Sequence, residues 1–316
     1  YRWYGEQFGN TYFQTFDRVL LDPACSGLGT LHKNPEILSW WTPAYCDRLS
    51  QTQQSLLISA IKSLRPGGVM TYSTCTLTPQ ENEAVIDFAL QNYPVEVEEI
   101  NLSGIKSWPG LTSYEGQHFH PDLSKTIRLY PFDRISEGFY VARLRKTDTM
   151  KAPSPERQKK PRKVGFLSRT TSPVKKYLDY LSGRFEIPDS ILENFAYTLK
   201  NDIFFASKDF HQFLFYGKPL QVGLPLAHTM TQAAKLNTTG AQILGEFVQK
   251  HLVELDDLKT LEKFINRDGL DILVDNSGQF VVKYKECGIG YGIAENGRLK
   301  SQFPKAEWPF ELSESE

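Results

Sequence analysis

The order of apolar segments near the start of the chain constrains its fold more than any other feature. A run at 18–21 (RVLL) has the length and character of a short buried strand. Residues 44–64 carry apolar side chains on one face at helical spacing, and the breaker at 65–68 (RPGG) ends that helix. Residues 69–73 (VMTYS) then predict a second buried strand. This alternation favours a parallel sheet covered by helices, which is an α/β fold.

The helix expected after the second strand has a recognisable start. Thr78 suits the N-cap, Pro79 suits the first helical position, and Glu81 can complete a reciprocal capping box with Thr78. The apolar face of this helix comprises Ala84, Val85, Phe88 and Ala89. We therefore expect the helix to begin at Pro79.

A change of composition near residue 147 marks a linker. The segment 151–163 (KAPSPERQKKPRK) is basic, rich in proline and free of aromatic residues. Residues 143–176 hold twelve Lys or Arg against two acidic residues, so they carry +10 while the rest of the chain carries −11. Such a run can follow RNA phosphates or simply form a solvated linker. Between 147 and about 171 we expect poor packing, with Phe166 and Leu167 as the only anchors.

Beyond the linker the pattern predicts a smaller α+β part. Helical segments are expected at 174–182 and 189–199, and strands at 280–284 and 290–293. The dipeptide Asn296-Gly297 predicts a tight hairpin turn. The chain is thus expected to comprise 1–146, a linker at 147–173, and 174–316.

Bulk properties exclude several classes of protein. Hydrophobic residues make up 40% of the 316 residues, no window approaches 18 consecutive apolar residues, and the start lacks the pattern of a signal peptide. The histidines show no metal-binding spacing, so no metal site is expected. The few cysteines are widely spaced, which favours free thiols in a reducing cytoplasm. These cysteines are Cys25, Cys46, Cys75 and Cys287.

Two cysteine motifs follow the two expected strands directly. Cys25 lies in 22–29 (DPACSGLG), and Cys75 lies in 74–76 (TCT). Because ligand sites in open parallel sheets lie beyond the carboxyl ends of strands, both thiols are expected at one edge. Cysteines brought together in this way can form a disulfide, a zinc site, a redox dithiol, or a nucleophile with an assisting thiol. Two small buried apolar residues would be the purely structural interpretation.

Four blocks of sequence together resemble the RNA cytosine-C5 methyltransferase family. They are DPACSGLGT at 22–30, RPGG at 65–68, YSTCTLTPQENEAV at 72–85, and KTIRLYP at 125–131 leading to EGFYVARLRK at 137–146. The family usually has proline directly before the first cysteine, whereas here Pro23 and Ala24 are exchanged. We expect a small backbone difference and no loss of role. The resemblance implies a Rossmann-like methyltransferase sheet, of which this chain carries a part.

The resemblance also implies the roles of three residues. Cys75 would add to carbon 6 of cytosine and turn carbon 5 into a nucleophile toward the methyl group of S-adenosylmethionine. Cys25 would then help remove the carbon 5 proton, and Asp22 would contact the ring nitrogen and amino edge. The family's glycine-rich cofactor loop has no counterpart before residue 17. We therefore expect the N-terminal half of the catalytic domain to lie outside this chain, with the cofactor-binding residues unknown.

The C-terminal part resembles the extension of RsmF-type rRNA methyltransferases, which includes a PUA-like RNA-binding domain. The strings that carry this likeness are KNDIFFAS at 200–207, VGLPL at 222–226, and GIGYG at 288–292 through NGRLKSQFPK at 296–305. The expected hairpin would present Arg298, Lys300 and Lys305 to RNA phosphates. RNA of the small ribosomal subunit is the expected partner. A tRNA methyltransferase and a non-catalytic RNA-binding protein are the alternatives, and the sequence predicts no oligomeric state.

Overall fold

The computed structural model describes residues 4–132, 137–154, 164–213, 216 and 219–305. By their internal contacts the residues form two compact units, Arg2–Lys160 and Pro161–Glu316, with Tyr1 grouped with the latter. The division falls inside the basic segment that composition singles out. Each unit has a core of its own.

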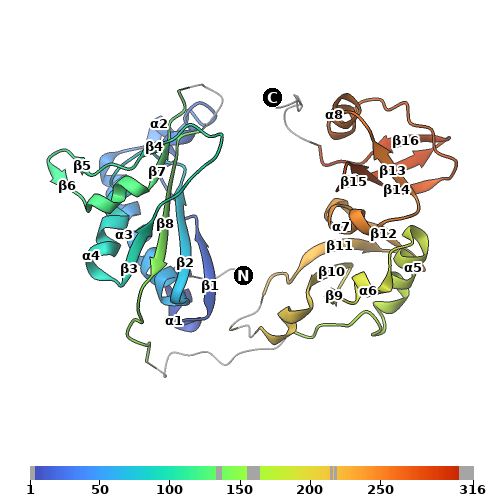
Figure 1. Cartoon of the computed structure of the whole chain (residues 1–316), viewed down its shortest axis with the longest axis horizontal. Helices are drawn as coiled ribbons and strands as arrows, with labels where there is room; N and C mark the ends of the chain where they lie inside the picture. Colours follow the sequence, from blue (N-terminus) through green and yellow to red (C-terminus); the bar gives the residue numbers. More distant parts are fainter. Residues whose placement is uncertain (1–3, 133–136, 155–163, 214–215, 217–218, 306–316) are drawn as a thin grey trace. The chain divides into compact units, whose positions relative to one another are not determined.

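The first unit is built on a six-stranded mixed sheet (Figure 1). Its strands are β1 (Phe16–Leu21), β2 (Leu64–Thr74), β8 (Phe139–Lys146), β7 (Ile127–Leu129) and β4 (Trp108–Pro109) in spatial order, with β3 (Val95–Glu98) also on β8. Only β1 and β2 pair in parallel. The two expected strands and the α/β class are confirmed, but a wholly parallel sheet is wrong because β8 enters antiparallel beside β2.

Helices cover one face of this sheet (Figure 1). The helices that pack on the sheet are α3 (Pro43–Ser63) and α4 (Glu83–Asn92), and α1 (Gly5–Thr11) packs on α3. The unit also contains α2 (Ile37–Trp40), the short turns η1 (Leu28–Thr30) and η2 (Pro121–Lys125), and a hairpin of β5 (Ser113–Tyr114) and β6 (Gln117–His118). Thr42 caps α3 by accepting a hydrogen bond from the Tyr45 backbone N–H. Leu57 and Ile61 of α3 pack with Tyr72 of β2 in the core.

The opposite face of the sheet is open. Leu20 of β1 is 74% exposed. A cavity of about 570 Å³ lies there, lined by Arg18, Val19, Leu20, Val69, Thr71 and Arg143. The sheet of this unit therefore buries the helix-covered face far more completely than the other.

The helix after β2 begins at Glu83 rather than at Pro79, so that prediction is wrong. Thr78 Oγ1 donates a 2.8 Å hydrogen bond to Glu81 Oε1, and Glu81 Oε2 accepts from the Ser26 backbone N–H and from Gln53 Nε2 at 2.9 Å each. The Glu81 carboxylate thus joins distant segments instead of closing a capping box. Residues 79–82 form turns ahead of the helix.

The second unit contains two four-stranded sheets. The first has β12 (Ala234–Leu236), β11 (Leu224–Thr229), β10 (Asp202–Ser207) and β9 (Phe195–Leu199), and the second has β13 (Leu252–Leu255), β14 (Gly278–Tyr284), β15 (Cys287–Glu295) and β16 (Arg298–Ser301). Its helical segments are α5 (Lys175–Phe185), α6 (Asp189–Leu192), α7 (Thr238–Leu244), α8 (Leu258–Asn266), η4 (Lys208–Gln212) and η5 (Gly245–Phe247). The strands expected at 280–284 and 290–293 are confirmed. The helix expected over 189–199 is wrong, since β9 occupies 195–199 and pairs with β10.

The hairpin predicted at Asn296-Gly297 is confirmed. Glu295 of β15 pairs with Arg298 of β16, which leaves Asn296 and Gly297 as a two-residue loop. Asn296 has φ 52° and Gly297 has φ 73°. Two successive residues with positive φ match the turn that asparagine and glycine favour in two-residue hairpins.

The flanks of the expected linker are packed more firmly than predicted. Met150 packs against the core of the first unit. Leu167 forms a β-bridge with Tyr197 in the second unit, and Arg169 is buried between two aspartates. The tight packing of Arg169 was not expected, because charged residues of a linker are normally solvated. Residues 155–163 lie outside the described residues.

Candidate active site

The two cysteine motifs meet at one edge of the sheet. Because β1 and β2 are parallel neighbours, the segments that follow them leave the sheet at the same end. Cys25 Sγ and Cys75 Sγ lie 3.3 Å apart, and both thiols are free and partly buried. Asp22 is the first residue after β1 and is exposed to solvent. The geometric condition for a shared site, two sulfurs at one sheet edge, is met.

Polar groups hold the two cysteine segments together. Ser26 Oγ and Thr76 Oγ1, each next to a cysteine in sequence, share a 2.8 Å hydrogen bond. Gln53 of α3 donates to the Ala24 carbonyl at 3.0 Å and also to Glu81. Sequence reasoning missed Glu81 in this role, although it lies in the string PQEN of the second motif. Nothing in the local pattern singles out Gln53.

Glycines allow the backbone to approach closely behind the cysteines. The Gly29 N–H donates to the Cys75 carbonyl and the Gly138 N–H donates to the Gly29 carbonyl, each at 2.9 Å. A Cβ added to Gly29 would lie 2.0 Å from the Gly138 carbonyl oxygen. A side chain at position 29 would therefore separate the first cysteine segment from β8.

These glycines do not fit a cradle for S-adenosylmethionine. A cofactor cradle needs backbone that is open to the ligand, but Gly29 and Gly138 are packed against each other and against Cys75. Gly27, with φ 71°, serves the turn before η1. The glycine-containing segment at 27–29 therefore belongs to the support of the cysteine pair.

The two thiols of the cysteine pair have very different pKa values. The hydrogen bond from Cys25 lowers the pKa of the Cys75 thiol from 9.0 to about 7. The same contact, followed by burial, raises the pKa of Cys25 far above its ordinary value. Cys75 is thus the thiol that becomes a thiolate near neutral pH, with Cys25 as its hydrogen-bond donor.

This division predicts a pH-dependent reactivity. Alkylation of Cys75 by iodoacetamide should increase with pH and reach half its maximum near pH 7, because only the thiolate reacts and it forms above the pKa. In Cys25→Ala the donor is lost, so the half-maximum should move upward toward pH 9. Mass spectrometry of the Cys75 peptide after short pulses measures both, with exposed Cys287 as the internal reference. An unchanged profile in Cys25→Ala would exclude the hydrogen bond as the cause.

Comparison with known proteins identifies the first unit. Residues 2–145 match the family model described as "16S rRNA methyltransferase RsmB/F". The first unit is therefore similar to 16S rRNA methyltransferases of the RsmB/F family.

Individual relatives extend this result. Ribosomal RNA small subunit methyltransferase F of Shewanella piezotolerans is 31% identical over 307 residues, covering 94% of this chain and 60% of that protein. The tRNA (cytosine(49)-C(5))-methyltransferase of Pyrococcus abyssi is 42% identical over 135 residues, covering 43% of each. The crystal structure of a methyltransferase homolog from Pyrococcus horikoshii has a TM-score of 0.40 at 33% identity, covering 46% of this chain and 44% of that one. The chain spans about 60% of the length of the methyltransferase F it matches.

Outside the RsmB/F-type unit, the hairpin carries two of the three residues predicted to contact RNA, Arg298 and Lys300, whereas Lys305 lies four residues beyond the end of β16. Arg298 and Lys300 lie two positions apart on β16, so their side chains share a face, and both are exposed. Lys305 is also exposed. Lys300 pairs with Glu295 at 2.6 Å, and Arg298 lies 3.8 Å from Asp271. An incoming phosphate would have to compete with these exposed carboxylates.

Much of the basic run is already engaged within the protein. Lys146 is fully buried, and its Nζ donates to the carbonyls of Ile61 and Leu64 at the end of α3. Arg143 and Arg145 both pair with Glu98 of β3. These three residues support the fold of the RsmB/F-type unit, so the start of the run belongs to the folded unit, which neither of the two alternatives for the basic run anticipated.

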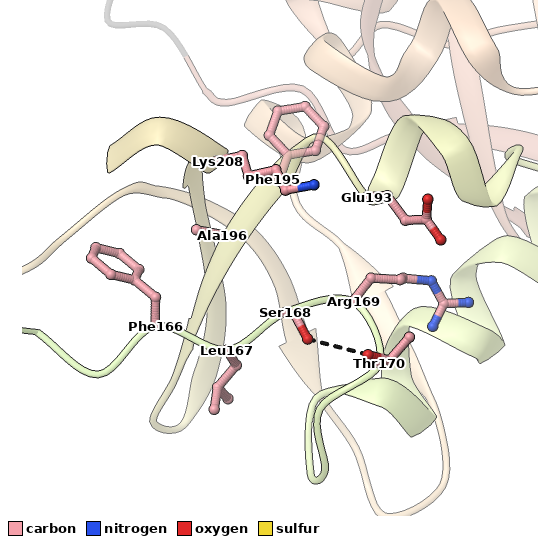
Figure 2. Close-up of a pocket in the computed structure, with 9 residues that line it drawn as sticks. All are labelled: Phe166, Leu167, Ser168, Arg169, Thr170, Glu193, Phe195, Ala196 and Lys208. Atoms are coloured by element: carbon pink, nitrogen blue, oxygen red, sulfur yellow. Dashed lines mark hydrogen bonds between the residues drawn. The ribbon is translucent and has the colours of Figure 1, made fainter. Parts of the chain in front are cut away.

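A cavity of about 400 Å³ in the second unit has a different character (Figure 2). It is lined by Phe166, Leu167, Ser168, Arg169, Thr170, Glu193, Phe195, Ala196 and Lys208. The buried Arg169 guanidinium is neutralised by Asp179 and Asp189, each at 2.7 Å. The cavity therefore offers no uncompensated charge from Arg169 and contains none of the residues predicted for catalysis or RNA contact.

Metal clusters and membrane-spanning helices are both absent from the described parts of the chain. No group of three or more His, Cys, Asp or Glu side chains among these residues is arranged to hold a metal ion. None of the helices in these parts combines the length and the apolar character needed to cross a membrane.

Proposed function

We propose that the protein methylates carbon 5 of cytosine in RNA, with Cys75 as the covalent nucleophile and S-adenosylmethionine as the methyl donor. The 3.3 Å contact between Cys25 and Cys75 carries this proposal, because it supplies a thiolate and an assisting thiol at one sheet edge. The match of residues 2–145 to the RsmB/F family model supports the same reaction.

The chemistry assigns successive tasks to the two thiols. The Cys75 thiolate adds to carbon 6, so a carbon–sulfur bond forms and electron density moves to carbon 5. After carbon 5 has accepted the methyl group, its proton must leave and the carbon–sulfur bond must break. The Cys25 pKa is raised chiefly by its contact with Cys75. Once Cys75 is bound to carbon 6, that contact no longer involves a thiolate, so the Cys25 pKa falls. The Cys25 thiol can then lose its own proton to solvent, and the resulting thiolate accepts the carbon 5 proton as the carbon–sulfur bond breaks.

Asp22 completes the proposed site from β1. It follows the strand directly, and its carboxylate is close enough to raise the pKa of Cys75 electrostatically, against the larger lowering by Cys25. We assign it the contact to the ring nitrogen and amino edge of the cytosine. Its exposure leaves the carboxylate accessible to a base that has left its stack.

For the substrate we propose 16S rRNA of the small ribosomal subunit. The similarity to methyltransferase F extends over 94% of this chain, whereas the similarity to the tRNA enzyme covers 43%. The longer match of 307 residues includes the second unit, whereas a match of 135 residues cannot span both units. We further propose that 1–146 is part of a Rossmann-like domain, 147–173 is a linker, and 174–316 binds RNA through a PUA-like end. The free cysteines suit a cytoplasmic location.

The proposed RNA contact at the hairpin predicts a change in salt dependence. Reversing the charge of Arg298, Lys300 and Lys305 should weaken binding of all RNA sequences alike. The slope of log affinity against log salt should flatten by about one for each phosphate that the variant no longer neutralises. Titration of fluorescent RNA at several salt concentrations measures this, with Lys250→Glu as a matched exposed control in the same unit. Equal affinity of the triple variant and the control would exclude the hairpin as a contact surface.

The proposed reaction is tested with the full-length protein and S-adenosylmethionine labelled in its methyl group. We expect label to enter carbon 5 of cytosine in 16S rRNA and to depend on both cysteines. Label in tRNA instead would transfer the proposal to the tRNA substrate. RNA binding without label in either would leave a non-catalytic RNA-binding protein.

A further inference from the structure

A cavity of about 500 Å³ adjoins the cysteine pair in the first unit. It is lined by Leu28, Trp41, Pro43, Cys46, Leu77, Thr78, Pro79, Gln80, Leu111, Tyr114, Glu115, Arg128 and Tyr130. Leu28 lies three positions after Cys25, and Leu77 lies two positions after Cys75. The cavity wall is therefore made from the same two segments that bring the sulfurs together.

The cavity offers aromatic surface without free positive charge. Trp41, Tyr114 and Tyr130 supply rings from three separate parts of the chain. Arg128 lines the cavity, but its Nε donates to Glu83 at 2.6 Å and its Nη1 donates to the Leu77 carbonyl at 3.0 Å. With Arg128 neutralised by a buried carboxylate and Glu115 also in the wall, a phosphate group would be disfavoured.

A buried donor in the wall remains without an acceptor. Trp41 Nε1 is inaccessible to solvent and has no hydrogen-bond partner among the described residues. The Trp41 indole lies near enough to the Cys46 thiol to lower the Cys46 pKa, an effect smaller than the rise caused by burial. No hydrogen bond of ordinary distance and angle joins the two groups. Because solvent cannot reach this N–H, Trp41 offers a ligand in the cavity its ring and not its donor.

We propose that this cavity binds the base of a nucleotide adjacent to the target cytosine. A flat, uncharged ring fits aromatic walls and the absence of free positive charge. A volume of about 500 Å³ also lies in the range of about 300–1,000 Å³ typical of small-ligand sites. The inference rests on the proposed function, since the neighbouring base is defined relative to the cytosine at Cys75.

Tyr114 is the residue best suited to test this inference. It lies on the β5–β6 hairpin and is 36% exposed, so its removal leaves the core intact. In the full-length protein Tyr114→Ala should lower kcat/KM for RNA about tenfold, in line with the loss of one base–aromatic stack. Tyr114→Phe keeps the ring and should stay within about twofold of the original protein. Trp40→Ala is the matched control, because Trp40 is an exposed aromatic residue outside the cavity lining.

The RNA supplies the second half of the experiment. Substrates that lack the base on the 5′ or the 3′ side of the methylated cytosine are compared with intact RNA. One of the two abasic substrates should lose about tenfold in kcat/KM, and Tyr114→Ala should lower it no further. The inference would be overturned if Tyr114→Ala and Trp40→Ala had equal kcat/KM. It would also be overturned if the loss from Tyr114→Ala multiplied the loss from the missing base on both abasic substrates. In either case the proposed methylation would stand. If the unaltered protein methylates no RNA, the proposed function fails and this inference falls with it.

Discussion

Replacing Cys75 with alanine in the full-length protein is expected to abolish methyl transfer to RNA and every covalent protein–RNA adduct. The loss should be about 10⁴-fold or more, because carbon 5 of cytosine does not react until a nucleophile has added to carbon 6. Cys25 is a poor substitute nucleophile, because its burial raises its pKa even when Cys75 is absent. Filter binding of methyl-labelled RNA and denaturing gels measure the two outcomes.

Replacing Cys25 with alanine should give the opposite result on the gel. Addition by Cys75 and methyl transfer can still occur, but the carbon 5 proton loses its acceptor and the adduct cannot collapse. A protein–RNA complex that survives denaturation should therefore accumulate, while release of methylated RNA falls. Cys287→Ala, which removes an exposed thiol of the second unit, should behave like the original protein. If Cys75→Ala accumulates the complex and Cys25→Ala does not, the roles of the two cysteines are reversed.

Removing the Arg128 side chain is expected to destabilise the first unit severely. Arg128 is 2% exposed and holds Glu83, which is fully buried, at the start of α4. Arg128→Ala would leave the Glu83 carboxylate buried without its partner, which costs about 3–5 kcal/mol of the free energy of unfolding. It would also release the Leu77 carbonyl beside the Cys75 segment. Urea unfolding followed by tryptophan fluorescence reports on this unit, because four of the five tryptophans lie in it.

An exposed ion pair in the same unit provides the control. Arg65 pairs with Asp17 at 2.9 Å, and their side chains are 55% and 73% exposed. Arg65→Ala should change the free energy of unfolding by less than about 1 kcal/mol, since solvent screens such pairs. If Arg128→Ala and Arg65→Ala lower the free energy of unfolding by the same small amount, the buried Arg128–Glu83 pair does not stabilise the unit as argued.

Local sequence determined the two strands of the first unit, the turn of the C-terminal hairpin and the meeting of the two cysteines. The runs at 18–21 and 69–73 form strands because short apolar segments between turn signals have few alternatives. The turn at Asn296-Gly297 forms because both residues tolerate positive φ. The meeting of Cys25 and Cys75 also follows from sequence, once both strands are recognised and their cysteines lie directly beyond them.

Other features depended on partners outside the segment itself. Glu81 has the spacing of a capping box, yet its carboxylate binds Ser26 and Gln53, so α4 begins later. The segment 195–199 has helical neighbours before it but pairs as β9 with β10. The partners of Glu81 are remote, and those of 195–199 lie in the next strand. In both cases hydrogen bonds outside the segment itself outweighed its local preference, which amounts to about 1 kcal/mol or less per residue.

Charge and burial show the same division. Sequence determined that 143–176 is rich in Lys and Arg, but it did not determine which of these cations remain in solvent. Lys146 is buried because β8 places it over the end of α3, where the carbonyls of Ile61 and Leu64 accept its hydrogen bonds. Similarly, the unequal pKa values of the two thiols require a sulfur–sulfur distance of 3.3 Å, which only the packing of both segments sets. Residue types determined which chemistry was available, and tertiary contacts decided which groups were desolvated, paired or left free to react.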